Sequence, residues 1–390
     1  MRRCLELALL GAGHTAPNPM VGAVLVHEDR IIGEGYHRKY GQAHAEVNCI
    51  AAVKEEDRPL IHQSTLYVSL EPCAHHGKTP PCADLIVEKK IPRVVVGCRD
   101  PFPQVNGKGI EKLLAAGVEV TLGVLEKECI HLNRRFFTFN ILHRPFVLLK
   151  WAQSANGKIA EAGRAEAGRA EVGRAEVGRA PKSEGRQGSD GEGRQRSGGE
   201  GGSHAGARTL ISNEYSNRLV HKWRSEEAAI LVGTRTALLD DPALTVRSWK
   251  GPNPVRLVID KENRLPSTLQ IFDRQTRTIV FNTLRHKEEG HEEEGNLLYY
   301  QLATDSSLVQ QLVLALYQLK IQSVLVEGGA RLLQSFIDEG YWDEARVITN
   351  NELEIPEGLA SPVLKDPQLL SYETLFSDTV RYYKNPASVF

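Results

Sequence analysis

The strongest constraint on the fold of this chain is a set of zinc-binding residue types in two short segments. These segments are HAE at residues 44–46 and EPCAHHGKTPPC at residues 71–82. Zinc prefers imidazole and thiolate ligands, and a catalytic site combines three protein ligands with one open position for water. His44, Cys73 and Cys82 supply such a set. The fold therefore has to bring together residues that lie far apart in the chain.

Local sequence patterns predict how these residues can meet. The segment TLYVSL (65–70) has the pattern of a strand and is followed by Cys73, while CADLIVEKK predicts a helix that opens at Cys82. Another helix is expected from about Ala43 to Val53. A thiolate is favoured at a helix N-terminus by the helix dipole. The pattern predicts one open zinc site.

Glu46 lies two residues after His44, near the start of the same predicted helix. A catalytic zinc lowers the pKa of water toward ~7, and a glutamate at this place can take the proton and pass it to leaving ammonia. An H-x-E pattern followed by P-C and a further cysteine is typical of zinc deaminases. A purely structural zinc and a pair of core thiols remain alternatives. Four other cysteines lie in apolar patterns and are expected in the core: Cys4, Cys49, Cys98 and Cys129.

The 390 residues are too many for one average core, so we expect two domains. Alternating helix and strand patterns predict an α/β sandwich over residues 1–143 and a second α/β domain over residues 144–365. In the second domain, a helix over 214–225 is expected to be capped by Ser212 or Asn213. Residues 366–390 are expected to form a C-terminal tail.

A low-complexity segment interrupts the second domain. Residues 161–207 begin with a five-residue AEAGR-like repeat and continue through a stretch with almost no apolar residue. Such a segment cannot bury enough surface to offset its ordering entropy, which predicts a disordered insertion. An arginine-rich contact with an anion or RNA is the alternative, although interleaved glutamates largely cancel its charge.

Charge and hydropathy exclude several classes of protein. The net charge of −1 gives no basis for broad nucleic-acid or membrane binding, and no apolar run is long enough to span a bilayer. Glu6 interrupts the apolar N-terminal stretch, which favours an amphipathic helix over a signal peptide. Six cysteines in so long a chain indicate a reduced, cytoplasmic protein rather than a disulfide scaffold.

Several segments together resemble the bifunctional deaminase–reductases of riboflavin biosynthesis. In the first domain these are TAPNPMVGAVLV, HAE, EPCAHHGKTPPC and DPFPQVNGKG; in the second they are HRPFVLLKWAQSANGKIA, DDPALTVR and VEGGARLL. The eight residues between the two cysteines are specific to this resemblance, because nucleoside and tRNA deaminases generally have a shorter spacing. The resemblance covers nearly the whole chain except residues 161–207 and the tail.

The resemblance implies a cytidine-deaminase-like α/β/α sandwich followed by a dihydrofolate-reductase-like α/β domain. The first domain would use Zn²⁺ to deaminate 2,5-diamino-6-ribosylamino-4(3H)-pyrimidinone 5′-phosphate, and the second would use NADPH to reduce the ribosyl group to ribityl. We expect a cytoplasmic homo-oligomer with a small-molecule substrate and no nucleic-acid or membrane partner. The alternative is a deaminase whose reductase domain is impaired by the insertion.

The resemblance also implies roles for individual residues. In the first domain Asn18 would hold the pyrimidine ring, and the contacts to the ring and ribose phosphate would be His76, Lys78, Asp100 and Asn106. Lys78 in a Gly-Lys-Thr loop is a sensible phosphate contact, although a solvated lysine is the alternative. In the second domain the NADPH contacts would be Gln153, Thr236, Asp240, Gly328 and Gly329. The substrate contacts would be Arg224, Leu244, Arg247 and Glu327, whose two arginines suit a phosphate.

The second domain departs from the family pattern in three places. Asn156 replaces the usual aspartate, Arg208 occupies a serine position and Leu210 occupies a tryptophan position. No G-x-G-x-x-G segment is present, and the two glycines of VEGG are weak evidence for phosphate binding because a tight turn also uses them. We expect the insertion to loop out without harm, because DDPALTVR and VEGG are intact. The chain also starts later than the family's usual first helix, so we expect a few residues to be missing there.

Overall fold

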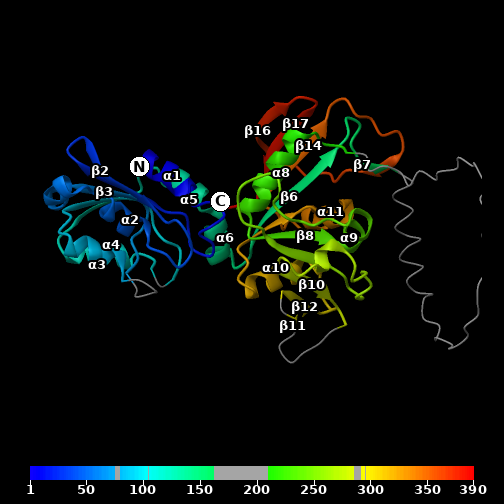
Figure 1. The fold of residues 1–390 in the computed structure, drawn as a ribbon, viewed down its shortest axis with the longest axis horizontal. Helices are drawn as coiled ribbons and strands as arrows, with labels where there is room; N and C mark the ends of the chain where they lie inside the picture. Colours follow the sequence, from blue (N-terminus) through cyan, green and yellow to red (C-terminus); the bar gives the residue numbers. More distant parts are fainter. Residues whose placement is uncertain (75–79, 104, 162–209, 285–290, 295) are drawn as a thin grey trace, which may run out of the picture.

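The computed structural model describes residues 1–74, 80–103, 105–161, 210–284, 291–294 and 296–390 (Figure 1). These residues form two large β-sheets, each covered by helices on both faces. The predicted insertion, residues 161–207, lies outside the described residues except for Glu161, which belongs to a strand, and His76, Lys78 and Arg208 lie outside them too.

The first sheet has the strand order β2-β1-β3-β4-β5. Its strands are β1 (Gly22–His27), β2 (Arg30–Tyr36), β3 (Thr65–Leu70), β4 (Arg93–Cys98) and β5 (Glu119–Leu122). The hairpin β1–β2 and the pair β1–β3 are antiparallel, whereas β3, β4 and β5 run parallel. The parallel ends of β3 and β4 therefore point to the same edge, where Cys73 follows β3.

Alternation along β1 explains the sandwich of the first domain. Leu25 faces a core with helices α2 (Ala45–Ala51), α3 (Cys82–Glu88) and α4 (Lys108–Ala115), while Val24 faces helix α1 (Arg2–Leu9). The predicted first helix and the predicted α/β/α sandwich are therefore confirmed. A 3₁₀ segment, Glu55–Gln63, connects α2 to β3. The four cysteines expected in the core are buried and free, as predicted: Cys4, Cys49, Cys98 and Cys129.

The second sheet has the order β11-β12-β10-β9-β8-β13-β6-β14-β17-β16 in the described part of the chain. The seven neighbouring strands β12, β10, β9, β8, β13, β6 and β14 run parallel to one another. The outer pairs β11–β12, β14–β17 and β17–β16 are antiparallel. The strands are β6 (Phe146–Gln153), β8 (Ala229–Gly233), β9 (Val255–Ile259), β10 (Thr278–Asn282), β11 (His291–Glu294), β12 (Leu297–Gln301), β13 (Ser323–Val326), β14 (Glu344–Asn350), β16 (Gln368–Leu375) and β17 (Asp378–Lys384). A separate small sheet pairs β7 (Lys158–Glu161) with β15 (Gly358–Ala360).

Helices cover both faces of the second sheet. Along β6, Val147 and Leu149 face α10 (Leu308–Gln318) and α11 (Ala330–Asp338), whereas Phe146 and Leu148 face α8 (Glu214–Glu226) and α9 (Thr234–Asp240). The described part also contains a 3₁₀ segment, Gln270–Phe272. Asn213 caps α8 by accepting hydrogen bonds from the backbone of Tyr215 and Ser216, which confirms one of the two predicted caps.

The expectation of a C-terminal tail over residues 366–390 was wrong. Strand β17 pairs with β14 along its whole length, and β16 pairs with β17, so these residues complete the second sheet. The hairpin turns at Phe376, whose φ is +55°. Most of β16 is exposed, and it is the last strand at this edge of the sheet. Its sequence therefore lacks the apolar face that marks a strand packed in a core.

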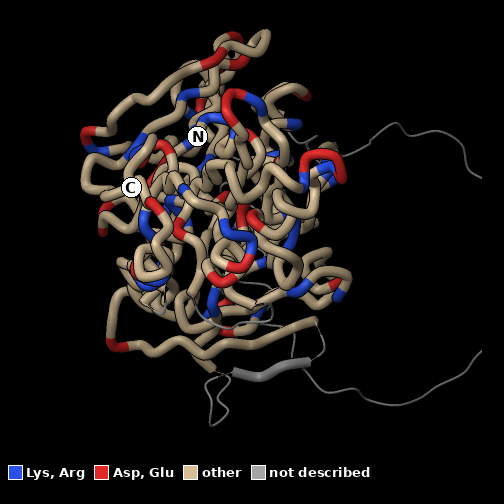
Figure 2. Tube along the Cα trace, turned by 90° about the vertical axis from the view of Figure 1, so that its left-hand side faces the viewer, with Lys and Arg blue, Asp and Glu red and all other residues tan. Residues whose placement is uncertain are grey.

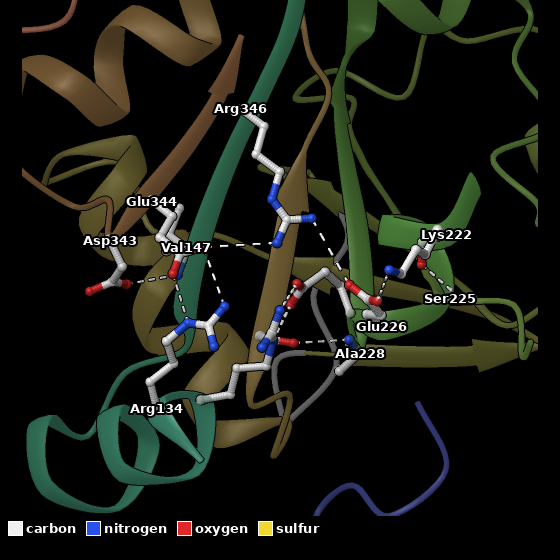
Figure 3. A network of polar contacts seen from close by, with 12 residues as sticks. Arg134, Val147, Lys222, Ser225, Glu226, Ala228, Asp343, Glu344 and Arg346 are labelled. Carbon is white, nitrogen blue, oxygen red and sulfur yellow. Dashed lines mark hydrogen bonds and ion pairs between the residues drawn. The ribbon is translucent and has the colours of Figure 1, made fainter. Parts of the chain in front are cut away.

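Helices α5 (Glu126–Leu132) and α6 (Arg134–Leu142) connect the two sheets, and α6 lies between them (Figure 1). Arg134 forms an ion pair with Glu344 of β14, with 2.7 Å between Nε and Oε1 (Figure 3). Arg135 forms a two-pronged ion pair with Glu227, whose side chain is fully buried. The interface network consists of three arginines and three glutamates, Arg134, Arg135, Arg346, Glu226, Glu227 and Glu344, and Lys222 also lies 4.0 Å from Glu226.

Acidic and basic residues are interspersed along the chain in the view of Figure 2, and neither sign gathers into one continuous stripe. Among the described residues, no helix has the length and apolar character needed to cross a membrane.

We predict that Glu227→Ala lowers the free energy of unfolding by about 3–5 kcal/mol, because it leaves Arg135 as a buried charge without its partner. Thermal and urea unfolding would measure this loss. The matched control is Glu119→Ala, which removes an exposed partner of Arg93 and should cost less than about 1 kcal/mol. Equal losses in both variants would show that the interface pair contributes no more than a surface pair.

The contribution of Glu227 should also depend on pH. Burial opposes ionisation, but Arg135 dominates and holds the pKa of Glu227 below its ordinary value. A carboxyl with a lowered pKa stabilises the fold fully above its unfolded pKa of about 4.3, and the effect is lost as the pH falls through the lowered value. The stability difference between the parent protein and Glu227→Ala should therefore shrink below about pH 4.

Candidate active sites

His44, Cys73 and Cys82 meet at the edge of the first sheet. His44 is the N-cap of α2, Cys82 is the first residue of α3, and Cys73 follows the end of β3. Their ligand atoms all lie within 4.8 Å of one another. Nδ1 of His44 is 3.6 Å from Sγ of Cys73 and 3.4 Å from Sγ of Cys82. Two helix starts and one strand end therefore converge on a single point, as the sequence predicted.

These separations fit a zinc ion. Zinc–sulfur bonds of about 2.3 Å and zinc–nitrogen bonds of about 2.0 Å at tetrahedral angles place ligand atoms about 3.5 Å apart. The backbone N–H of Cys82 donates to Sγ of Cys73 at 3.4 Å. Hydrogen bonds from Cys82 and His44 lower the pKa of the Cys73 thiol, although burial opposes this shift, while the same contact with Cys73 raises the pKa of Cys82. A thiolate is the form of cysteine that binds metal.

Glu46 is buried in the first turn of α2, beside this donor set. Burial raises the pKa of its carboxyl to about 7, and the nearby sulfur of Cys73 adds to the shift. The carboxyl lies within hydrogen-bonding reach of the Cys82 thiol. A buried acid that titrates near neutral pH suits general acid–base catalysis, because it can both accept and return a proton.

Glu71 fixes the strand end that carries Cys73. Its carboxylate is buried and accepts hydrogen bonds from the backbone N–H of Asp100, just after β4, and from those of Gly107, Gly109 and Ile110 at the start of α4. A negative charge at a helix N-terminus is favourable. Gly109 permits this approach, because a Cβ there would collide with the carbonyl oxygen of Pro72. Pro72 and Cys73 are thus held against α4.

Asn18 is linked to the donor set by His37, because it bonds to His37 and the ring of His37 lies next to that of His44. No sequence pattern singled out His37. His37 is buried, and its ring centroid lies 5.4 Å from that of His44. Nδ1 of His37 bonds to the carbonyl oxygen of Ala43 at 3.1 Å, and Nε2 bonds to Nδ2 of Asn18 at 3.2 Å. A carbonyl only accepts, so Nδ1 carries the proton and Nε2 accepts from the Asn18 amide.

The other predicted contacts of the first domain differ in their exposure. Asp100 is buried close to Cys73, and burial raises the pKa of its carboxyl to about 7. Its Oδ1 accepts a hydrogen bond of 2.7 Å from the backbone N–H of Phe102. Asn106 is exposed in the loop before α4. Asp100 and Asn106 thus lie on one loop, which Glu71 also holds.

A second cluster of charged residues lies where β13 ends in the other sheet. Arg224 of α8 forms a two-pronged ion pair with Glu327, at 2.9 and 2.7 Å. Nζ of Lys150 on β6 lies 4.0 Å from the same carboxylate. Burial opposes ionisation, but Arg224 and Lys150 lower the pKa of Glu327 to about 2. Sequence reasoning missed Lys150, because a single lysine inside an apolar strand carries no pattern of its own.

The predicted NADPH contacts come from neighbouring parallel strands. Strand β13 lies between β8 and β6, so the carboxyl ends of these strands meet at one edge of the sheet. In open α/β sheets ligands bind outside these ends. Gln153 ends β6, Thr236 and Asp240 lie on α9 after β8, and Gly328 and Gly329 follow β13. A Cβ on Gly329 would lie 3.3 Å from Oγ1 of Thr236, so α9 closely approaches the glycine turn.

The remaining predicted substrate residues follow α9. Leu244 is buried with a φ of +52°, whereas Arg247 is exposed. Helix α8 holds this segment through two contacts: the backbone N–H of Arg247 donates to Nδ1 of His221 at 3.1 Å, and Arg224 donates to the carbonyl oxygen of Thr245 at 3.3 Å. Arg224 therefore links this segment to Glu327.

Two departures from the family pattern can be placed in the structure. The side chain of Asn156 donates to the carbonyl oxygen of Ile355 at 2.9 Å and accepts from its N–H at 3.2 Å. It also accepts a hydrogen bond from the hydroxyl of Ser154 at 2.6 Å. The asparagine therefore holds the loop that follows Gln153. Leu210 is 69% exposed, so its replacement of a tryptophan leaves no hole in the core.

Comparisons with known proteins cover both domains. The zinc-binding region of cytidine and deoxycytidylate deaminases matches residues 1–98, and the RibD C-terminal domain matches residues 198–350. The riboflavin biosynthesis protein RibD of Aquifex aeolicus is 35% identical over 361 residues, which cover 92% of this chain and 88% of that protein. RibD of Escherichia coli is 32% identical over 358 residues, with coverages of 88% and 84%.

Solved structures agree with these matches. The crystal structure of a diaminohydroxyphosphoribosylaminopyrimidine deaminase/5-amino-6-(5-phosphoribosylamino)uracil reductase from Thermotoga maritima aligns with a TM-score of 0.78 and 34% identity, covering 98% of this chain and 97% of the other. RibD of Acinetobacter baumannii aligns with a TM-score of 0.79 and 29% identity, at the same coverages. The chain therefore belongs to the RibD family of bifunctional riboflavin-biosynthesis enzymes, in which a zinc-dependent deaminase domain precedes an NADPH-dependent reductase domain.

Proposed function

We propose that the His44–Cys73–Cys82 site deaminates the diaminopyrimidine ribotide of riboflavin biosynthesis and that the carboxyl edge of the second sheet then reduces its ribosyl group. The observation that carries this proposal is the three-ligand donor set with the buried carboxyl of Glu46 beside it. Three protein ligands leave one coordination position for water, as in catalytic rather than structural zinc sites.

The deamination follows from the residues around this donor set. Zinc in such a site acts as a Lewis acid that makes water nucleophilic near neutral pH. Glu46 accepts a proton from the attacking water and returns it to the amino group, which leaves as ammonia. Its buried carboxyl lies beside the donor set, where it can both accept and return a proton. Glu71 and the helix starts hold the sulfur atoms in place while the proton moves.

Residues around the donor set bind the pyrimidine and its ribose phosphate in this proposal. Asn18 donates to His37, so its amide oxygen can accept a hydrogen bond from the pyrimidine ring. Asp100 and Asn106 face the substrate from the loop before α4. His76 and Lys78, outside the described residues, belong to the loop between the two cysteine ligands, where Lys78 would contact the phosphate.

The reduction takes place at the edge formed by β6, β8 and β13. NADPH supplies a hydride to C1 of the ring-opened ribosylamino group, and the product carries a ribitylamino chain. The NADPH contacts are Gln153, Thr236, Asp240, Gly328 and Gly329. The substrate contacts are Arg224, Leu244, Arg247 and Glu327. The ion pair of Glu327 with Arg224 fixes the guanidinium, which can still use its other N–H groups on a phosphate.

We also propose that the chain is a cytoplasmic homo-oligomer. All six cysteines are free thiols in the structure, which fits a reducing compartment. The edge strand β16 exposes Leu369, Leu370 and Tyr372, and next to it the rings of Phe376 and Tyr215 lie 4.4 Å apart. An exposed edge strand with apolar side chains offers both unpaired backbone groups and apolar surface to a second copy.

The exchange Glu46→Gln should abolish deamination while zinc content and fold are kept, because glutamine has the same shape but cannot accept the proton. Ammonia release from the diaminopyrimidine ribotide, together with the zinc content of the purified protein, measures this. The matched control is Glu55→Gln, an exposed residue of the 3₁₀ segment, which should leave activity unchanged. Retained ammonia release in Glu46→Gln would reject the assigned role of Glu46.

The parent chain should oxidise NADPH in a single turnover when given the deaminated ribotide. Glu327→Gln should lower kcat/KM of this step at least about tenfold, because it removes the charge that fixes Arg224 and Lys150. The control is Glu339→Gln, an exposed residue at the end of α11. If the parent chain fails to oxidise NADPH, the deaminase-only alternative is correct.

Tyr372→Arg should weaken self-association, because it places a charge in the middle of the exposed edge strand. Sedimentation velocity over a range of protein concentrations would show the shift to smaller species. Leu122→Arg, an exposed apolar residue on β5 of the first domain, is the control. A parent protein that sediments as a monomer at all concentrations would exclude the oligomer.

A further inference from the structure

We propose that the reductase domain completes the deaminase site: Gln322 is a positioning residue that holds the loop carrying Asn18. The inference rests on the proposed contact between Asn18 and the pyrimidine. It assigns a role in deamination to a residue directly before β13, at the end of this strand opposite the reductase contacts.

Gln322 reaches across the interface between the two domains. The residue is buried directly before β13, and its Nε2 donates a hydrogen bond of 2.6 Å to the carbonyl oxygen of Pro17. Its own carbonyl oxygen accepts from the backbone N–H of Phe146 at 2.8 Å, which ties Gln322 to the start of β6. The donor is therefore fixed by the central strands of the reductase sheet, and Pro17 directly precedes Asn18.

The loop from Gly13 to Met20 is also held at its two ends. The backbone N–H of Met20 donates to Oδ1 of Asn133 at 2.8 Å, and Nδ2 of Asn133 donates to the backbone oxygen of Met20 at 2.9 Å. At the other end, Gly13 has a φ of +76° and lies so close to α8 that a Cβ would collide with the carbonyl oxygen of Ser225. Gln322 therefore supplies the contact in the middle of the loop, next to Asn18.

A short chain of hydrogen bonds connects Pro17 to the zinc ligands, so a displacement of Pro17 would be transmitted to them. The amide of Asn18 bonds to His37, and His37 bonds to the carbonyl oxygen of Ala43, the residue before His44. The backbone N–H of Asn18 bonds to the carbonyl oxygen of Thr15 at 2.8 Å, so the turn moves as a unit. Loss of the Gln322 contact should therefore misplace the amide oxygen that faces the pyrimidine.

The interface also provides room for such a shift. A cavity of about 200 Å³ lies between the domains, and its lining includes Asn18, Pro19, Arg135, Glu227 and Gln322. In a close-packed interior a lost hydrogen bond need not change the position of a loop. Beside this cavity the loop can relax, so the hydrogen bond from Gln322 decides where Asn18 lies.

The test is a double-mutant cycle between Gln322 and Asn18 in the full-length zinc-loaded protein. Gln322→Leu keeps the approximate size but removes the donor, and should raise the KM for deamination of the diaminopyrimidine ribotide about threefold to tenfold. Zinc content and the kinetics of NADPH-dependent reduction should not change. Gln322→Glu, which keeps the length but cannot donate when ionised, should act in the same direction. The control is Gln310→Leu, at an exposed position on α10.

The cycle separates the two proposals. Because Gln322 acts through Asn18, the double variant Gln322→Leu/Asn18→Ala should be no worse than Asn18→Ala alone. If the KM changes of Gln322→Leu and Asn18→Ala multiply in the double variant, or if Gln322→Leu has the parent KM, the positioning role is overturned. The substrate contact of Asn18 would remain intact in either case. An Asn18→Ala protein with unchanged deamination would instead reject that contact, and the positioning role with it. Equal losses of deamination and reduction in Gln322→Leu would indicate a general loss of folding and also overturn the proposal.

Discussion

Both sites depend on one constraint: the first residues of helices must be held close to the last residues of strands. His44 caps α2, Cys82 opens α3 and Cys73 follows β3, so the zinc donor set exists only while these elements keep their positions. The carboxylate of Glu71 secures this arrangement by accepting the unpaired backbone N–H groups at the start of α4. The reductase cluster uses the same principle, because the turn with Gly328 and Gly329 joins the end of β13 to α11.

The two domains are joined by buried charge as well as by apolar contacts, such as those of Phe137 with Phe390 and of Phe139 with Tyr317. Arg134 and Arg135 reach from α6 to Glu344 of β14 and to Glu227 at the end of α8, and the buried side chain of Glu227 leaves little tolerance for a lost partner. Ion pairs of this kind contribute little net stability but strongly penalise misplacement. The network therefore favours one relative arrangement of the sheets. A fixed arrangement is what a contact such as that between Gln322 and Pro17 requires.

The sequence predicted the parts of the structure that have strong local patterns. The strand over 65–70, the helix opening at Cys82 and the capping by Asn213 all follow from neighbouring residues. Contacts between distant segments could not be predicted in this way: His37, Lys150 and Gln322 carry no pattern and gain their places only through tertiary packing. Strand β16 was missed for a related reason, because an exposed edge strand lacks a buried face. The loop with His76 and Lys78 stays a prediction.

Asn156 shows how a departure from a family pattern can keep a local structure. Its amide donates to and accepts from the backbone of Ile355, whereas an ionised aspartate could only accept. The loop after β6 is thereby tied to the segment after β14, on the same edge as Gln153. Strand β7, which leads from this loop into the insertion, also pairs with β15. The chain that enters the insertion is therefore held by this pairing up to Glu161, and the expectation that the insertion leaves the reductase intact stays a prediction.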